Sequence, residues 1–158
     1  MPEFTIRPAG EKDAESILQI AARMADNGIP PWRDRGKALA WHHAEALHLL
    51  ETSHPESRLL VAEMAGEVTG FIYFFPEQDF LTGEQQGYIA GFAVSAAAEG
   101  HGVGSALLRE VEVWCREKGF RVLTLDVFAA NSAARAFYAR RGFQEQTLKM
   151  ARLLTGTE

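Results

Sequence analysis

The sequence predicts an α/β (α+β) fold with a mixed, mostly antiparallel central sheet flanked by about four helices. Segments with strand-like alternation are interspersed with segments whose apolar residues recur at helical spacing, in the order β-α-α-β-β-β-α-β-α-β. The chain has 158 residues, 47% of them hydrophobic and 23% charged, which is enough apolar mass for a substantial core. We therefore expect a single domain over residues 1–158.

Six segments are expected to form strands. They are residues 4–7 (stopped by Pro8), 58–64, 68–75, 88–94, 122–127 and 144–154. The tight connection 65–67 predicts a hairpin, and residues 76–83 are expected to be a loop. Residues 144–154 contain neither Gly nor Pro, so we expect one long strand there. A missing or exchanged last strand would leave an edge that could pair with a second chain, so we expect a homodimer.

Four segments are expected to form helices: residues 13–24, 36–50, 102–118 and 132–140. Asp13 is suited to cap the start of the first helix, and Gly119 is suited to end the third. Residues 27–35 contain Gly28, Pro30 and Pro31, so they form a loop between the first two helices.

Charge and cysteine content exclude several classes of protein. The formal net charge is -5, which argues against a nucleic-acid partner because such proteins need a positive surface. Cys115 is the single cysteine, so no disulfide forms within the chain and a Cys-rich metal site is excluded. His43 and His48 have poor spacing for metal ligands, so we expect no metal. We see no signal peptide and no apolar run that spans a bilayer, and we expect a cytoplasmic protein without a membrane partner.

A glycine-rich turn follows the fourth predicted strand and leads directly into a helix. Gly100, Gly102 and Gly104 alternate in it, so backbone N–H groups are exposed with no Cβ in the way. The first N–H groups of a helix lack partners and carry partial positive charge, which suits a phosphate or pyrophosphate. The spacing matches neither a Rossmann fingerprint nor a Walker A loop. A tight strand-to-helix turn without a ligand is the alternative.

Two stretches of the sequence are similar to one known family. The letters "FAVSAAAEGHGVGSALL" resemble the acyl-CoA motif of the GCN5-related N-acetyltransferases (GNAT), and "LDVFAANSAARAFYARRGF" resembles their second motif. The opening "IRPAGEKDAESI" also resembles the first strand and helix of that family. The resemblance covers nearly the whole chain and implies a GNAT-like fold, acetyl-CoA as cosubstrate and acetyl transfer to a primary amine by direct attack.

The resemblance also implies roles for particular residues. The fourth strand would pair with the pantetheine arm and polarise the acyl carbonyl, with Val94 N–H as the best oxyanion donor. Asn131 would contact the cofactor near its reactive end, and Tyr138 would be the general acid that protonates the departing thiolate. The expected cofactor-binding residues are Phe92, Ala93, Val94, Gly100, His101, Gly102, Val103, Gly104, Ser105 and Asn131.

One residue departs from the family pattern at the predicted pyrophosphate turn. Glu99 stands where the family has Gln or Arg. Two unit charges about 6 Å apart repel by roughly 3 kcal/mol at an effective dielectric near 20. Charge-assisted hydrogen bonds of roughly 1.5–3 kcal/mol each should outweigh this repulsion. We therefore expect weakened CoA binding. His101 could offset the charge if protonated, or it could be an exposed loop histidine.

The general base is less well specified. Some members of the family use a glutamate on the fourth strand, where this chain has Tyr88, and others use an acid on the fifth strand, where Asp126 stands. Asp126 is either a catalytic base or the structural partner of a backbone group, and water relays to bulk solvent are a third alternative. Trp32 either lines the acceptor site or packs as an ordinary core residue.

The acceptor is expected to be a small-molecule or peptide amine whose identity the sequence leaves open. One rival function is a non-catalytic module that binds or senses CoA, which would keep the glycine turn without needing Tyr138. Another is an interaction domain that has lost the cofactor site, for which Glu99 is the best argument. A third is a transferase for longer acyl groups, which the bulky Phe92 and Tyr88 disfavour.

Overall fold

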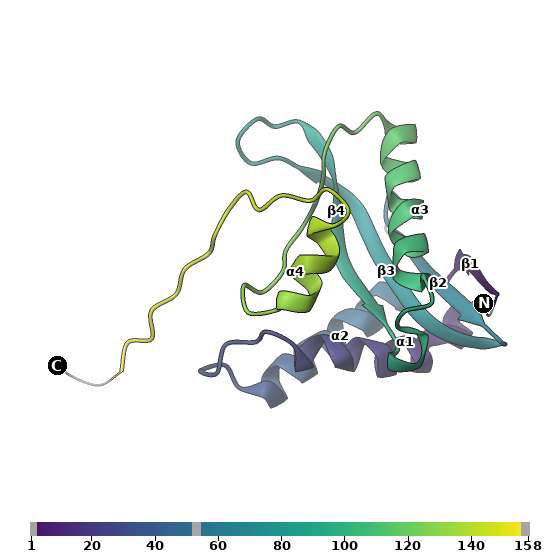
Figure 1. The fold of residues 1–158 in the computed structure, drawn as a ribbon, viewed down its shortest axis with the longest axis horizontal. Coiled ribbons are helices and arrows are strands. Elements are labelled where there is room, and N and C mark those ends of the chain that lie inside the picture. The colour runs from purple at the N-terminus through teal and green to yellow at the C-terminus, as the bar shows by residue number, and fades with distance from the viewer. Residues whose placement is uncertain (1–2, 52–54, 156–158) are drawn as a thin grey trace.

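The computed structural model describes residues 3–51 and 55–155 and contains one five-stranded sheet in the order β1-β2-β3-β4-β5 (Figure 1). Neighbouring strands are antiparallel except β4 and β5, which are parallel. The strands are β1 Phe4–Pro8, β2 Arg58–Met64, β3 Glu67–Gln78, β4 Gln85–Val94 and β5 Leu123–Leu125. This mixed, mostly antiparallel sheet confirms the predicted fold class.

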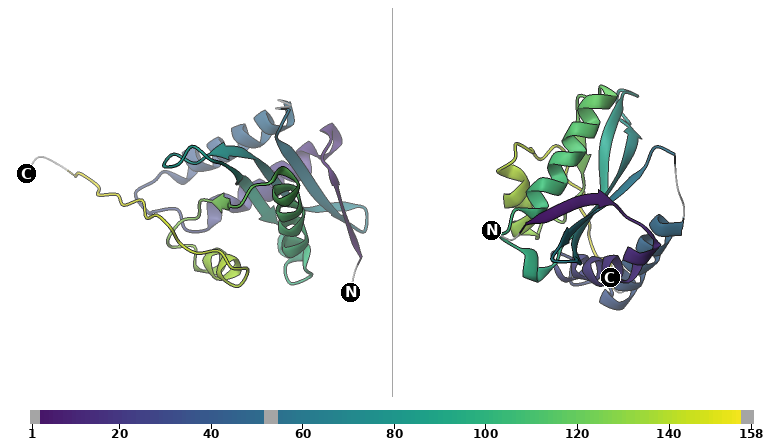
Figure 2. Two further views of the ribbon diagram at one scale, coloured as in Figure 1. Left: turned by 90° about the horizontal axis from the view of Figure 1, so that it is seen from above. Right: turned by 90° about the vertical axis from the view of Figure 1, so that its right-hand side faces the viewer.

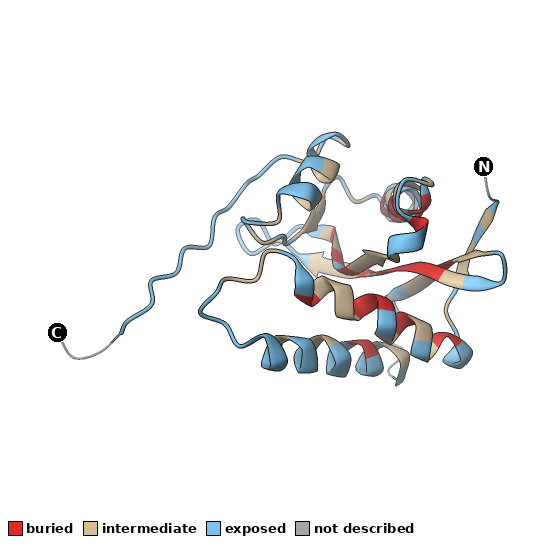
Figure 3. Ribbon diagram, turned by 60° about the horizontal axis from the view of Figure 1, so that its bottom comes forward, coloured by how far each residue is buried: buried red, intermediate tan, exposed pale blue. Residues whose placement is uncertain are grey.

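The helices cover the sheet on its two faces (Figures 2 and 3). Helices α1 (Ala14–Ala21) and α2 (Arg35–Glu51) lie on one face, and α1 continues into the 3₁₀ segment η2 (Ala22–Asp26). Helix α3 (Val103–Lys118) and the shorter α4 (Ser132–Ala139) lie on the other face. Two further 3₁₀ turns are η1 (Glu11–Asp13) and η3 (Ala96–Ala98).

Alternation along the central strands builds a separate core on each face. On β3, Phe71 packs with Ile17 and Ile20 of α1, whereas the neighbouring Ile72 packs with Leu107 of α3. Because successive side chains point to opposite faces of a strand, Tyr73 and Phe75 follow Phe71 toward the α1 side. The α1 side and the α3 side of the sheet are defined by these two cores.

A β-bulge divides β4 into two parts. Tyr73 pairs with Gly91 and Phe74 with Ile89, so Ala90 is an inserted residue in β4. The parallel pairing with β5 covers Gly87 to Ile89 and goes no further. Beyond the bulge, β4 has β3 on one edge and no strand on the other within the described residues.

The observed ends of β3 and β5 differ from the predicted ones because of the strands that neighbour them. The predicted loop at 76–83 is wrong at its start, since β3 continues to Gln78 and Pro76 pairs with Gly87. The pairing with β2 ends at Phe74, so Pro76 has no β2 neighbour that would need its missing N–H. The fifth strand, predicted at 122–127, is limited to Leu123–Leu125, because β4 departs from it at the bulge.

The predicted last strand is wrong. Residues 144–154 form no strand or helix, and all of them are exposed. The segment runs away from the sheet as an extended tail (Figures 1 and 2). Its composition permits an extended conformation, but a strand also needs a hydrogen-bonding neighbour, and none is beside it in the described part of this chain.

Asp13 is buried at the start of α1 without making a side-chain cap to that helix. Its carboxylate accepts two hydrogen bonds of 2.8 Å from the Arg7 guanidinium and one of 2.8 Å from the Gly10 amide. Arg7 also donates to Glu63 on β2. The hydrogen bonds from Arg7 hold the pKa of Asp13 below its ordinary value.

Candidate active site

The free edge of β4 presents backbone groups to the space where β4 and β5 separate. Ser95 donates its amide to Thr69 of β3 at 2.7 Å, so its backbone groups are directed at β3. Because backbone direction alternates along a strand, Val94 and Phe92 direct their N–H and C=O groups to the free edge. The Arg23 side chain binds the Val94 carbonyl there. This edge can accept an extended, amide-bearing ligand as an additional strand.

The glycine turn after β4 forms the start of α3, as predicted. Gly100 and Gly102 both have φ of 81°, in the left-handed region that favours glycine. The Ala106 amide is the first to bond back, to the Gly102 carbonyl at 3.0 Å. The amides of Val103, Gly104 and Ser105 therefore precede the first helical bond and are available to an anion. His101 is half-buried within the turn.

The Glu99 carboxylate at this turn is paired with a cation. Its carboxylate accepts a hydrogen bond of 2.7 Å from Arg23, which also binds the Val94 carbonyl. Arg23 belongs to η2, on the opposite side of the sheet from α3. Sequence reasoning missed Arg23, because no local pattern links a residue after the first helix with one 76 positions later.

Tyr138 lies in an aromatic cluster on the α3 side of the sheet. Its ring centroid is 5.4 Å from those of Phe137 and Phe143 and 6.4 Å from that of Phe92 on β4. Burial raises the pKa of Tyr138 to about 12, because the phenolate is poorly solvated there. The hydroxyl consequently stays protonated over the whole physiological range.

Tyr88 and Asp126 form a pair on the opposite, α1 side. The Tyr88 hydroxyl donates to Asp126 Oδ2 at 2.8 Å. Burial first, and then this hydrogen bond, raise the pKa of Tyr88 above its ordinary value. Asp126 directly follows Leu125, the last β5 residue paired with β4. The carboxylate is therefore at the point where the two strands separate, with a side-chain partner rather than the backbone partner considered above.

Asn131 starts α4, where its side-chain carbonyl accepts a hydrogen bond of 3.2 Å from the Ala134 amide. The loop between η2 and α2 covers this turn. A Cβ at Gly28 would lie 2.9 Å from Phe128 Cβ and 3.0 Å from Asn131, and Arg33 lies over the Phe128 ring at 5.8 Å. Trp32 in the same loop is 47% exposed, so it is not a core residue. The loop thus packs against the turn that connects β5 to α4.

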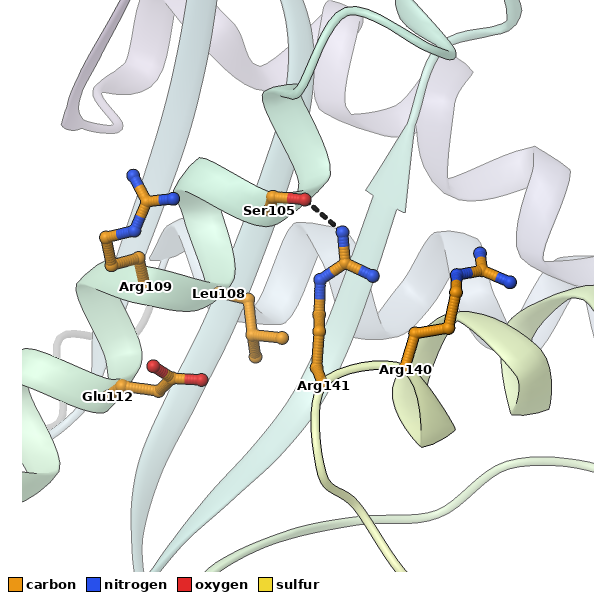
Figure 4. Close-up of a pocket in the computed structure, with 6 residues that line it drawn as sticks. All are labelled: Ser105, Leu108, Arg109, Glu112, Arg140 and Arg141. Carbon is orange, nitrogen blue, oxygen red and sulfur yellow. Dashed lines mark hydrogen bonds between the residues drawn. The ribbon is translucent and has the colours of Figure 1, made fainter.

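A cleft of about 410 Å³ separates α3 from the end of α4 (Figure 4). It is lined by Ser105, Leu108, Arg109, Glu112, Arg140 and Arg141. Arg141 donates to the Ser105 hydroxyl and stacks on the Phe137 ring at 3.5 Å from its centroid. Three arginines against one glutamate make the cleft positive. Ser105 belongs both to this cleft and to the glycine turn, so the two sites adjoin.

Two kinds of feature are absent from the described residues. They contain no cluster of three or more His, Cys, Asp or Glu side chains that could hold a metal ion. No helix among them has the length and apolar character needed to cross a membrane.

Comparison with known proteins agrees with this geometry. The acetyltransferase (GNAT) family model matches residues 17–143. An aminoglycoside N(6')-acetyltransferase type 1 from Stenotrophomonas maltophilia is 28% identical over 144 residues, which are 89% of this chain and 86% of the relative. A solved structure described as an acetyl transferase from Pyrococcus furiosus superposes with a TM-score of 0.77 at 26% identity, covering 96% of this chain and 100% of that one.

A second solved structure, aminoglycoside N-acetyltransferase AAC(6')-Iy with a CoA-containing bisubstrate analogue, shares the fold with a TM-score of 0.70 at 19% identity. The coverage is 97% of this chain and 99% of that chain. The fold and the family match together define an acyl-CoA-dependent transferase class. The chain belongs to the GNAT acetyltransferase family, and its enzyme class is acetyl-CoA-dependent N-acetyltransferase.

Proposed function

We propose that this protein transfers the acetyl group of acetyl-CoA to a primary amine by direct attack in the gap between β4 and β5. The observation that carries the proposal is the free edge of β4, with Tyr138 on one face of the sheet and Asp126 on the other. An acid and a base on opposite sides of a gap can serve a leaving thiolate and an incoming amine separately.

The residues around the gap fit acetyl-CoA, which supplies an activated acetyl thioester when bound. The free edge of β4 at Phe92 and Val94 would pair with the pantetheine amides, while Ala93 directs its side chain into the α1-side core. Within residues 100–105, the His101 amide already donates to the Ala98 carbonyl. The amides of Val103, Gly104 and Ser105 would hold the pyrophosphate. The side-chain carbonyl of Asn131 is engaged in its helix cap, so its amide NH₂ would contact the cofactor.

The chemistry would be divided among three groups. The N–H of Val94, directed into the gap, would stabilise the oxyanion that develops on the acetyl carbonyl. Asp126, held by Tyr88, would accept a proton from the acceptor amine, directly or through water. Tyr138, protonated at every physiological pH, would donate to the departing sulfur.

The positive cleft between α3 and α4 would hold the phosphorylated nucleotide end of CoA. Arg109, Arg140 and Arg141 line it, and Ser105 joins it to the pyrophosphate turn. Arginine suits phosphate because its planar fork of donors can bind two oxygens at once.

For the acceptor we propose a small-molecule amine that enters from the α1 side. A stripe of aromatic rings lies there, with Tyr73 and Phe75 at 5.6 Å and Phe75 and Tyr88 at 5.4 Å between centroids. The Asp126 carboxylate is bonded to the last of these rings. Aromatic faces and a carboxylate attract a cationic amine. The aminoglycoside-acetylating relative supports amino sugars as the first acceptors to test; a peptide amine is the alternative.

The test measures release of CoA thiol with acetyl-CoA and a panel of amino sugars, polyamines and peptides. Tyr138→Phe should lower kcat by about 100-fold, the usual contribution of a general acid, and leave the Kd for CoA within about twofold, because binding uses other groups.

Since the pKa of Tyr138 is about 12, wild-type kcat should show no loss from its ionisation between pH 8 and 10. Unchanged kcat in Tyr138→Phe would remove the acid role. CoA binding without turnover on any amine would favour the non-catalytic module.

We also propose a homodimer in which the tail of one chain pairs with the open outer edge of β5 in another. Leu148, Met150 and Leu154 alternate along the tail and are 74%, 90% and 82% exposed. An unpaired strand edge and an unpaired extended segment are complementary. Light scattering should give twice the chain mass, and Leu148→Asp with Met150→Asp should give a monomer; a monomeric wild-type chain would contradict the proposal.

The cytoplasm is the proposed location. Cys115 is buried and free, and a lone thiol suits a reducing compartment. Cell fractionation checks this.

A further inference from the structure

Arg23 contacts both the end of the free β4 edge and the residue that precedes the predicted pyrophosphate turn. Its guanidinium bridges the Val94 carbonyl and the Glu99 carboxylate, the latter at 2.7 Å. Val94 ends the strand edge and Glu99 directly precedes the glycines of the turn. A single side chain therefore connects the two halves of the proposed cofactor site.

The net charge beside the glycine turn is not the negative charge of Glu99 alone, because Arg23 is paired with it. Glu99 is 63% exposed and adjoins the amides that face an anion, so alone it would repel a diphosphate. The Arg23 side chain is 34% exposed and balances that charge. A guanidinium has five N–H donors, and the two bonds described leave three of them for further acceptors.

We propose that Arg23 is a binding residue for the diphosphate of acyl-CoA and that Glu99 holds it in position. Where the family pattern has a Gln or Arg, this chain has Glu99, and the positive charge beside it comes from η2, across the sheet edge. The inference rests on the proposed function and adds to it a residue outside both sequence motifs. It also changes the expected effect of Glu99, which becomes an anchor for the cation instead of a defect in the site.

The experiment titrates CoA calorimetrically into the wild-type protein and into Arg23→Ala, Glu99→Gln and the double variant. Arg23→Ala should weaken CoA binding by about 10- to 100-fold, the factor carried by charge-assisted hydrogen bonds. Glu99→Gln should change it by less than about threefold, because losing the anchor of Arg23 weakens binding while losing a carboxylate that repels the diphosphate strengthens it. The double variant should bind about three- to tenfold better than Arg23→Ala, because no carboxylate is left unopposed.

Arg35→Ala is the matched control. Arg35 forms an exposed ion pair of 2.8 Å with Asp26 at the end of the same segment, so its removal deletes an arginine without touching the turn. It should change CoA binding by less than about twofold, since exposed ion pairs contribute little.

S-Acetylpantetheine separates a charge role from a structural one, because it has the thioester and the amides without the diphosphate. Arg23→Ala should keep kcat/KM for this substrate within about twofold of wild type, while kcat/KM for acetyl-CoA falls by about 10- to 100-fold. Equal losses with both substrates would mean that Arg23 only braces the end of β4, and the inference would be wrong. Unchanged CoA affinity in Arg23→Ala would also overturn it. Wild-type protein that fails to bind CoA would refute the proposed function itself, so the two failures are distinguishable.

Discussion

The two halves of β4 have the same strand conformation and different environments. From Gly87 to Ile89 the strand has β3 on one edge and β5 on the other, and the Gly87 amide and carbonyl both bind partners on the β5 side. From Ala90 to Val94 the β5 edge is free, and among the described residues Arg23 is the side chain bound to it. One inserted residue separates the part of β4 that is paired on both edges from the edge that is proposed to bind acetyl-CoA. Substitutions that disturb the packing of the first half should therefore change stability, and those at the junction of the halves or beside the second half should change turnover.

The largest effect that sharpens this comparison is expected at Asp126, where the two halves meet. Asp126→Asn should lower kcat/KM for the amine by about 100-fold if the carboxylate is the base, and the melting temperature should stay within about 2 °C because the side chain is exposed. Tyr88→Phe should have a smaller effect, because it removes only the hydroxyl donor that orients Asp126. It should lower kcat/KM by about three- to tenfold.

Steady-state kinetics with the best acceptor measures both variants. If Asp126→Asn retained full kcat/KM across pH 6–9, proton removal would proceed through water to bulk solvent, and the Tyr88–Asp126 pair would be structural.

The next effect concerns Gly87, in the structural half. A Cβ there would lie 2.5 Å from Cys115 Sγ and 3.1 Å from Leu123 Cδ1. Gly87→Ala should destabilise the protein by about 1–3 kcal/mol through overpacking, a fall in melting temperature of about 3–10 °C. In a Cys115→Ala background the same change should cost less than half as much, because the nearest atom is gone. Thermal melts of the four proteins check this, and additive effects would show that Sγ is not the obstacle.

Sequence predicted the elements that carry their own packing signal. The strand at 58–64 and the helix at 102–118 were placed within a residue of β2 and α3, because each pattern of apolar residues matches one buried face. The tail at 144–154 was mispredicted for the opposite reason. Its residue composition favours an extended backbone, but a β-strand also requires a neighbouring strand to pair with. Whether such a neighbour is present depends on tertiary or quaternary structure.

The site was predictable where motif and local structure coincide. The turn at Gly100 and Gly102 and the position of Tyr138 beside the Phe92 ring of β4 follow from strand-helix context. The contact of Arg23 with Glu99 and the bond between Tyr88 and Asp126 join elements distant in sequence. Residue spacing contains no information on such contacts, so the compensation of Glu99 could only be found in three dimensions.

The smallest predicted effect tests whether reagents can reach the half of β4 that is paired on both edges. Cys115 lies against Gly87, is 6% exposed, and has its pKa raised by burial from 9.0 to about 11. Its thiol should not react with a disulfide reagent at pH 7.5 in the native state and should react fully in denaturant, because thiolate and access are both lacking. The raised pKa also means that the unfolded thiol ionises first, so stability from this group is present below about pH 9 and lost as pH rises toward 11. Rapid native labelling at pH 7.5 would show that this end of the strand opens, and the contrast between the halves of β4 would fail.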